Sequence, residues 1–265
     1  MLPRKSSEPA IVGLLPAAGS AARISPIPCS KEVFPIGFHP SESDLGLRPK
    51  ASAHYLLEKM QLAGAQRAYF ILRDGKWDIP AYFGDGSMVG LPLGYLMMDL
   101  PYGVPYTVDQ AYPFTEGATV LFGFPDILFQ PGDAFVRLLN RRDETGSDLV
   151  IGLFPAYQPH KMDMVELDPG GRVAGITIKP HQTQLRFTWI IAVWGDRFSR
   201  FIHEFVASHK QIQSPEREPR EIYLGDVIQA AIQNGERVEH VLFSDGRYID
   251  IGTPEDLMAA VQKPI

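Results

Sequence analysis

The sequence predicts an α/β fold in which a mixed, mostly parallel β-sheet is flanked by helices. Three continuous apolar runs carry this prediction: AIVGLLPA (10–17), RAYFILR (67–73) and ATVLFGF (118–124). Strands that are buried on both faces, as in a parallel sheet, have this pattern. KASAHYLLEKMQLAGA lies between the first two runs and has apolar residues at helical spacing, with Gly64 as a stop. Strand, helix and strand in this order predict a right-handed βαβ unit.

The second half of the sequence predicts further helices and strands and a β-hairpin. MVELDPGGRVAGITIK (164–179) has two alternating segments around a Asp-Pro-Gly-Gly turn, which is a hairpin signal. The last helix is expected to begin at Pro254, with Thr253 as its N-cap. Other helices are predicted at 132–144, 196–209 and 221–235, and other strands at 148–154 and 186–195. The expected architecture is a parallel α/β unit that carries a mixed-sheet insertion.

Length, composition and charge limit the function classes. The chain has 265 residues, 45% apolar and 21% charged, which suits a single globular domain over 1–265. A net charge of −6 without a basic tract argues against a nucleic-acid partner. No stretch approaches the ~20 apolar residues of a membrane span, and the N-terminus lacks the apolar region of a signal peptide. We therefore expect no membrane partner and a cytoplasmic location.

Several conspicuous side chains are expected to have structural roles. Cys29 is the only cysteine, so no intrachain disulfide can form. The seven histidines have no metal-site spacing. Trp189 and Trp194 lie on one predicted strand and are expected in the core.

The segment LLPAAGSAARISPIPCSKEVFPIG (14–37) is the first candidate for chemistry. A buried strand leads into small residues, and Arg23 and Lys31 follow. Such a loop can bring backbone N–H groups close to a phosphate. The segment is neither a Walker loop nor a dinucleotide fingerprint, because the required glycine spacings are missing. From composition alone, a tight turn with two surface cations explains it equally well.

The wider pattern resembles the sugar-1-phosphate nucleotidylyltransferases (nucleotide-sugar pyrophosphorylases), nearest their glucose-1-phosphate thymidylyltransferase branch. The entry loop carries the family's Gly, Arg, Pro, Ser-Lys and apolar-Pro-apolar order. Further matches follow in the same order along nearly the whole chain: FGDGSMVGLPLGYLMMDLP (83–101), VLFGFPDILF (120–129), ITIKP (176–180), EIYLGDVIQAAIQNG (221–235) and RYIDIGTPEDLMAA (247–260). Each match is weak alone, and their shared order carries the resemblance.

The resemblance implies a Rossmann-like fold of the nucleotide-diphospho-sugar transferase type with a small β-rich sugar-binding subregion. The nucleotide-binding part would cover about 8–150 and the sugar-binding and closing part about 151–265. The implied reaction joins a nucleoside triphosphate, with dTTP or UTP favoured, to a sugar 1-phosphate and releases pyrophosphate. The implied cofactor is Mg²⁺, and the implied assembly is a homo-oligomer.

The same resemblance assigns roles to individual residues. Arg23 and Lys31 would be catalytic cations, over the leaving phosphates and at the α-phosphate respectively. Asp126 and Asp250 would bind the metal, since Mg²⁺ prefers carboxylate oxygens. The candidate substrate-binding residues are the loop residues Ala18, Gly19 and Ser20, the strand-end Lys179, and Asp163.

Departures from the family pattern keep a second function open. Leu100 and Pro105 stand where the family carries base-recognising glutamine and glycine, so base preference is not predicted. Ile178 replaces a glutamate of the sugar site, and Asp163 is the candidate substitute for that acceptor. A catalytically weak homologue that acts as a nucleotide-binding regulatory subunit is therefore the alternative. A glycosyltransferase is less favoured, because no Asp-x-Asp motif stands near Asp126.

Overall fold

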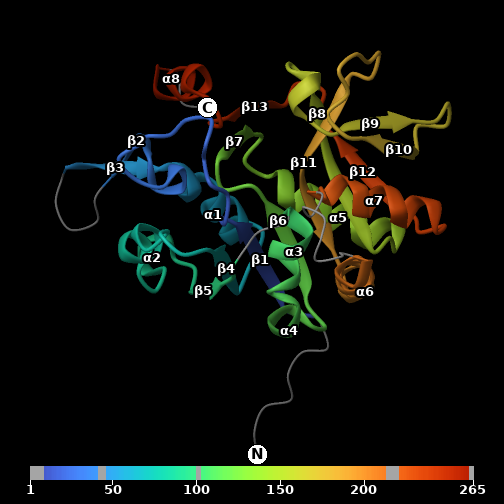
Figure 1. The fold of residues 1–265 in the computed structure, drawn as a ribbon, viewed down its shortest axis with the longest axis horizontal. Coiled ribbons are helices and arrows are strands. Elements are labelled where there is room, and N and C mark those ends of the chain that lie inside the picture. The colour runs from blue at the N-terminus through green and yellow to red at the C-terminus, as the bar shows by residue number, and fades with distance from the viewer. Residues whose placement is uncertain (1–8, 41–45, 100–102, 213–220, 263–265) are drawn as a thin grey trace, which may run out of the picture.

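The structure, a computed structural model, describes residues 9–40, 46–99, 103–212 and 221–262 (Figure 1). Within these ranges a nine-stranded sheet runs through the molecule in the order β10-β9-β11-β6-β1-β4-β5, with β8 beside β11 and β12 beside β8. The strands are β1 (Ile11–Pro16), β4 (Arg67–Leu72), β5 (Leu93–Met97), β6 (Thr119–Gly123), β8 (Leu149–Pro155), β9 (Met164–Leu167), β10 (Val173–Thr177), β11 (Phe187–Trp194) and β12 (Val238–Leu242). Their pairings show that β10 and β11 run against the other seven, so the sheet is mixed and mostly parallel, as predicted.

Strand β11 divides the sheet into two arms. On one edge it pairs with β8 along its whole length. On the other edge its last residues pair with β6, whereas its first residues, Phe187 and Thr188, pair with β9. Strands β6 and β9 therefore diverge along one edge of β11, and the residue between the two pairings is Trp189.

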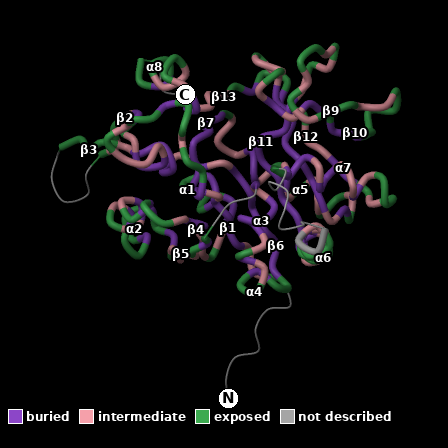
Figure 2. Tube along the Cα trace, viewed as in Figure 1, coloured by how far each residue is buried: buried purple, intermediate pink, exposed green. Residues whose placement is uncertain are grey.

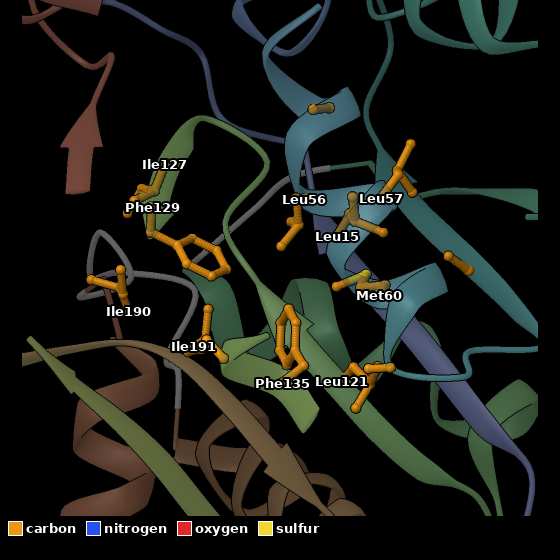
Figure 3. Close-up of a cluster of buried hydrophobic side chains, with 14 of the residues drawn as sticks. Leu15, Leu56, Leu57, Met60, Leu121, Ile127, Phe129, Phe135, Ile190 and Ile191 are labelled. Atoms are coloured by element: carbon orange, nitrogen blue, oxygen red, sulfur yellow. The ribbon is translucent and has the colours of Figure 1, made fainter. Parts of the chain in front are cut away.

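Helices cover both faces of the sheet because successive residues of a buried strand point in opposite directions. On β1, Leu15 belongs to one buried cluster and Leu14 to the other. The first face packs against α1 (Ser52–Leu62) and α5 (Ala134–Thr145), and Figure 3 shows Met60 of α1 beside Leu15. The second face packs against α3 (Val104–Asp109), α6 (Asp196–Ile212) and α7 (Leu224–Gln233). In Figure 2 the central strands are buried, whereas the outer loops are exposed.

Two small antiparallel sheets complete the fold. Strands β2 (Pro35–Pro40) and β3 (Leu47–Ala51) pair on one side of the molecule, and β7 (Ile127–Gln130) pairs with β13 (Arg247–Asp250) (Figure 1). The shorter helices are α2 (Asp78–Phe83), α4 (Tyr112–Thr115) and α8 (Pro254–Gln262), and 3₁₀ turns lie at Lys31–Val33, Ser87–Val89 and Pro159–Lys161. Among the described residues no helix is both long and apolar enough to cross a bilayer.

Most predicted elements are present, with small shifts at their ends. The helix predicted at 221–235 begins at Leu224, because the Asp226 carboxylate accepts a hydrogen bond from the Tyr223 amide at 2.8 Å and caps it there. The 164–179 hairpin is present, and Thr253 caps α8 through its hydroxyl. Trp189 and Trp194 are buried, as expected. Strands β2, β3, β5, β7 and β12 were not predicted, because their short runs mix apolar residues with glycine, proline or charged residues.

Candidate active site

A cavity of about 210 Å³ opens where β6 and β9 separate along β11. The segment after β6 and the segment before β9 both contribute to its wall. Ligands of open α/β sheets commonly bind beyond the carboxyl ends of strands, where neighbouring strands diverge. The charged residues that line the cavity are Arg23, Asp126, Lys161, Asp163, Lys179, Glu221 and Asp250.

Asp126 and Asp250 are brought together by the small β7–β13 sheet. Asp250 pairs with Ile127, and the Ile251 amide donates to the Asp126 carbonyl at 3.1 Å, so the two aspartates are neighbours across the sheet. Burial, then repulsion by Asp126, raises the pKa of Asp250 to about 6. Two adjacent carboxylates in a cavity are a donor set that fits Mg²⁺, which commonly takes one or two protein carboxylates beside substrate phosphates. Elsewhere in the described ranges, no group of three or more His, Cys, Asp or Glu side chains is arranged to hold a metal ion.

Lys31 lies against the same carboxylates. Its Nζ donates a hydrogen bond to Asp126 Oδ2, and both side chains are largely shielded from solvent. Burial alone would lower the pKa of Lys31, but attraction by Asp126, Glu32 and Asp250 outweighs it, and the pKa is raised. Lys31 therefore stays protonated at neutral pH and is available to neutralise an incoming phosphate.

Three contacts hold the backbone around Lys31. Asp78, at the start of α2, accepts hydrogen bonds from the Ser30 amide at 2.5 Å and from its hydroxyl at 2.7 Å. Lys76 forms a buried ion pair with Glu32 at 2.8 Å. The Ser52 hydroxyl donates to the Lys31 carbonyl at 2.6 Å. We call the contacts of Ser30, Glu32, Lys76 and Asp78 the Lys31 clamp, and the family resemblance did not point to Lys76 or Asp78.

Arg23 reaches the cavity from the entry loop, close to Asp250. A Cβ built on Gly252 would lie 2.8 Å from Arg23 Nη2 and 2.9 Å from Asp250 Oδ1, so both side chains approach the same glycine. Only the absence of a side chain at this position allows that approach. The loop itself turns at Ala21, which has a φ of +53°. Ala18, Gly19 and Ser20 do not line the cavity: Ala18 is buried in the core, and the other two are exposed beside β1.

The opposite wall carries Asp163 and Lys179. The Nζ of Lys179 lies 3.8 Å from the centre of the Tyr223 ring, and Lys179 has a φ of +38° at the end of β10. Burial raises the pKa of Asp163 to about 6, although Lys179 opposes this effect. The positions at which the family resemblance predicted site residues thus contribute six charged side chains to one small region, namely Arg23, Lys31, Asp126, Asp163, Lys179 and Asp250. Lys161, Glu221 and Tyr223 also line the cavity and were not predicted; they lie in loops without a local signal.

Comparison with known proteins adds the family to this geometry. Residues 17–264 match the family model described as nucleotidyl transferase. The chain belongs to this family. The nucleotidyl transferase match includes every residue of the region described above.

Curated relatives of this nucleotidyl transferase chain are distant. It is 26% identical over 252 residues to glucose-1-phosphate thymidylyltransferase of Streptomyces antibioticus, covering 92% of this chain and 64% of that protein. It is 23% identical over 254 residues to low-salt glycan biosynthesis nucleotidyltransferase Agl11 of Haloferax volcanii, covering 94% and 65%. The chain therefore spans slightly less than two thirds of the length of these relatives.

Solved structures share the fold. The crystal structure of a glucose-1-phosphate thymidylyltransferase from Bacillus anthracis, described there as putative and bound to sucrose, superposes with a TM-score of 0.79 at 16% identity, covering 96% of this chain and 94% of that one. A UDP-glucose pyrophosphorylase in complex with UDP-glucose superposes with a TM-score of 0.75 at 14% identity, covering 96% and 97%. At these identities the likeness establishes the architecture, including its mixed, mostly parallel sheet.

Proposed function

We propose that this protein is a sugar-1-phosphate nucleotidylyltransferase that uses Mg²⁺. The observation that carries the proposal is the gathering of Arg23, Lys31 and Lys179 around the Asp126–Asp250 pair at one cavity. Two polyanions must meet in this reaction, so an active site needs cations for their phosphates and carboxylates for a metal. The names of the curated relatives support the same reaction class.

In the proposed reaction a phosphate oxygen of the sugar 1-phosphate attacks the α-phosphorus of the nucleoside triphosphate. A new P–O bond forms, the bond between the α-phosphorus and the bridging oxygen breaks, and pyrophosphate leaves with the bond electrons. Arg23 would neutralise the leaving phosphates, Lys31 the α-phosphate and Lys179 the phosphate of the sugar. Asp126 and Asp250 would hold Mg²⁺, which supplies charge neutralisation at the triphosphate.

Lys31 has two roles in this scheme. In the ligand-free protein it neutralises Asp126, which would otherwise repel Asp250 without compensation. When a metal ion takes over both carboxylates, the ammonium group becomes free to bind phosphate. The Lys31 clamp keeps its backbone fixed during this exchange.

For the donor we propose dTTP or UTP. The support is the resemblance to the thymidylyltransferase branch together with the names of two relatives, glucose-1-phosphate thymidylyltransferase and UDP-glucose pyrophosphorylase. Leu100, one of the two substitutions in the base-recognition segment, lies outside the described residues. Pro105, the other, is buried in the first turn of α3.

The test is a pyrophosphate-release screen of nucleoside triphosphates against sugar 1-phosphates, with and without Mg²⁺. We expect turnover with at least one pair, dependent on the metal, and lost in Lys31→Met. The matched control is Lys161→Met, which removes a cation at the cavity wall that pairs with Asp256 at 3.5 Å rather than with the metal-site carboxylates. Nucleotide binding without turnover for any pair would instead support the regulatory-subunit alternative.

A further inference from the structure

Two polar atoms at the cavity wall have no partner in the protein. Asp163 Oδ1, a hydrogen-bond acceptor, and Trp189 Nε1, a donor, are both buried from solvent, and neither makes a hydrogen bond. Both residues line the cavity. Leaving such a group unpaired costs about 1–3 kcal/mol, and native proteins rarely leave buried polar atoms unpaired without a reason.

The sheet directs these two side chains to the same place. Thr188 pairs with Met164 in the antiparallel β9–β11 ladder, so the next pair in that register is Trp189 with Asp163. Residues opposite each other in an antiparallel ladder point to the same face. The Thr188 hydroxyl also donates to the Asp163 carbonyl at 2.9 Å, which holds the register one residue beyond the end of β9.

A β-bulge sets the direction of Trp189. In the β11–β8 ladder the register shifts between Trp189 and Ile191, so Ile190 is the extra residue. Bulges commonly re-aim a side chain next to a functional site. Trp194, on the same strand but beyond the bulge, is deep in the core, and its Nε1 donates to Ser199 Oγ at 3.0 Å. The two tryptophans of β11 therefore differ in one respect: only the indole at the cavity lacks an acceptor.

The remaining neighbours of Asp163 limit what can pair with it. The other carboxylate oxygen, Oδ2, lies where a side chain on Gly225 would be, 2.5 Å from the position of such a Cβ, and Ile178 Cδ1 lies at 2.6 Å from the same point. The carboxylate of Asp163 thus lies beside the apolar Ile178. Lys179 lies near enough to act on Asp163 electrostatically, which places a phosphate-binding cation next to the unpaired acceptor.

We propose that Asp163 and Trp189 form a donor–acceptor pair that selects a sugar carrying hydroxyl groups at the positions that face them. The proposal rests on the proposed function, because it takes the ligand to be a sugar 1-phosphate. A hydroxyl group both donates and accepts, so it can donate to Asp163 Oδ1 and accept from Trp189 Nε1. An ammonium group only donates and would leave the indole N–H unpaired, and a deoxygenated carbon would leave both atoms unpaired.

The test uses glucose 1-phosphate, its monodeoxy analogues, and the 2-amino and 2-acetamido sugars. Turnover is measured by pyrophosphate release, and binding is measured by calorimetry with a non-hydrolysable dTTP or UTP analogue present and absent. We expect one monodeoxy analogue to lose at least about 100-fold in affinity and in kcat/KM, because a site built for a hydroxyl strongly rejects the analogue without it. Trp189→Phe, which keeps the ring and removes the N–H, should reduce that ratio at least about tenfold. Asp163→Asn, which keeps an acceptor, should retain more of it than Asp163→Leu.

The matched control is Trp194→Phe, the same substitution on the same strand, which should leave the hydroxyl-to-deoxy ratio unchanged. The inference is overturned if no deoxy analogue is rejected, if Trp189→Phe keeps the full ratio, if an amino or acetamido sugar is preferred, or if none of the sugar phosphates binds. Discrimination in binding without any turnover would overturn the proposed function and keep this inference. Turnover without discrimination would do the reverse.

Discussion

Replacing Asp163 with asparagine should stabilise the ligand-free protein at neutral pH. The carboxylate is forced into a cavity wall where one oxygen has no partner, and burial raises its pKa from 3.8 to about 6. At about 1.4 kcal/mol for each tenfold change in proton affinity, this rise corresponds to about 3 kcal/mol of lost stability when the group is ionised. Asparagine has nearly the same shape and carries no charge.

The sign of the pH dependence follows from the raised pKa. Because folded Asp163 binds a proton more tightly than unfolded Asp163, the wild type loses stability as the pH rises from about 4 to about 6. The asparagine variant has no such group. Its advantage should be near zero at pH 4, grow between about pH 4 and 6, and level off above pH 7 at up to about 3 kcal/mol.

Urea unfolding of wild type and Asp163→Asn across pH 4–8, with EDTA present, measures this difference. In a chain of this size, about 3 kcal/mol also corresponds to roughly 6–12 °C in Tm. Asp168→Asn is the control: Asp168 lies in the turn of the same hairpin and pairs with Arg172 near the surface, where asparagine can still accept the Arg172 amide. A stability difference that is independent of pH, or a variant less stable than wild type at pH 7.5, would refute the reasoning.

Three further changes test the rest of the site. Asp126→Asn and Asp250→Asn should each abolish Mg²⁺-dependent turnover, by at least about 10³-fold, with the circular dichroism spectrum unchanged, whereas Asp245→Asn on the exposed loop before β13 should keep it; normal rates in either variant would make that aspartate structural. Lys76→Met should destabilise the protein by about 3–5 kcal/mol in urea unfolding, because it leaves Glu32 buried and unpaired, and Glu32→Gln combined with Lys76→Met should recover part of the loss; equal stability of the single and double variants would show that the ion pair does not matter. Gly252→Ala should lower kcat at least about tenfold in the pyrophosphate-release assay with folding retained, because the added methyl group would lie under 3 Å from Arg23 and Asp250; an unchanged kcat would show that both side chains can move aside without consequence.

The sequence by itself determined the elements that depend on local pattern. The buried strands β1, β4 and β6, the helices α1, α5 and α6, and the hairpin of β9 and β10 follow from apolar periodicity and turn residues, which act over a few neighbouring positions. The ordered family motifs also singled out Arg23, Asp126 and Asp250, since their residue types could be matched one by one along the chain.

The tertiary structure decided which of these residues meet. Asp126 and Asp250 are brought together by pairing between β7 and β13, and Lys76 reaches Glu32 across a turn that no local pattern announces. Trp189 was expected only in the core, and its role at the cavity depends on a bulge and on the divergence of β6 and β9 along β11. Contacts of this kind join residues far apart in the chain, so their geometry depends on strand register and packing, which one sequence does not encode locally.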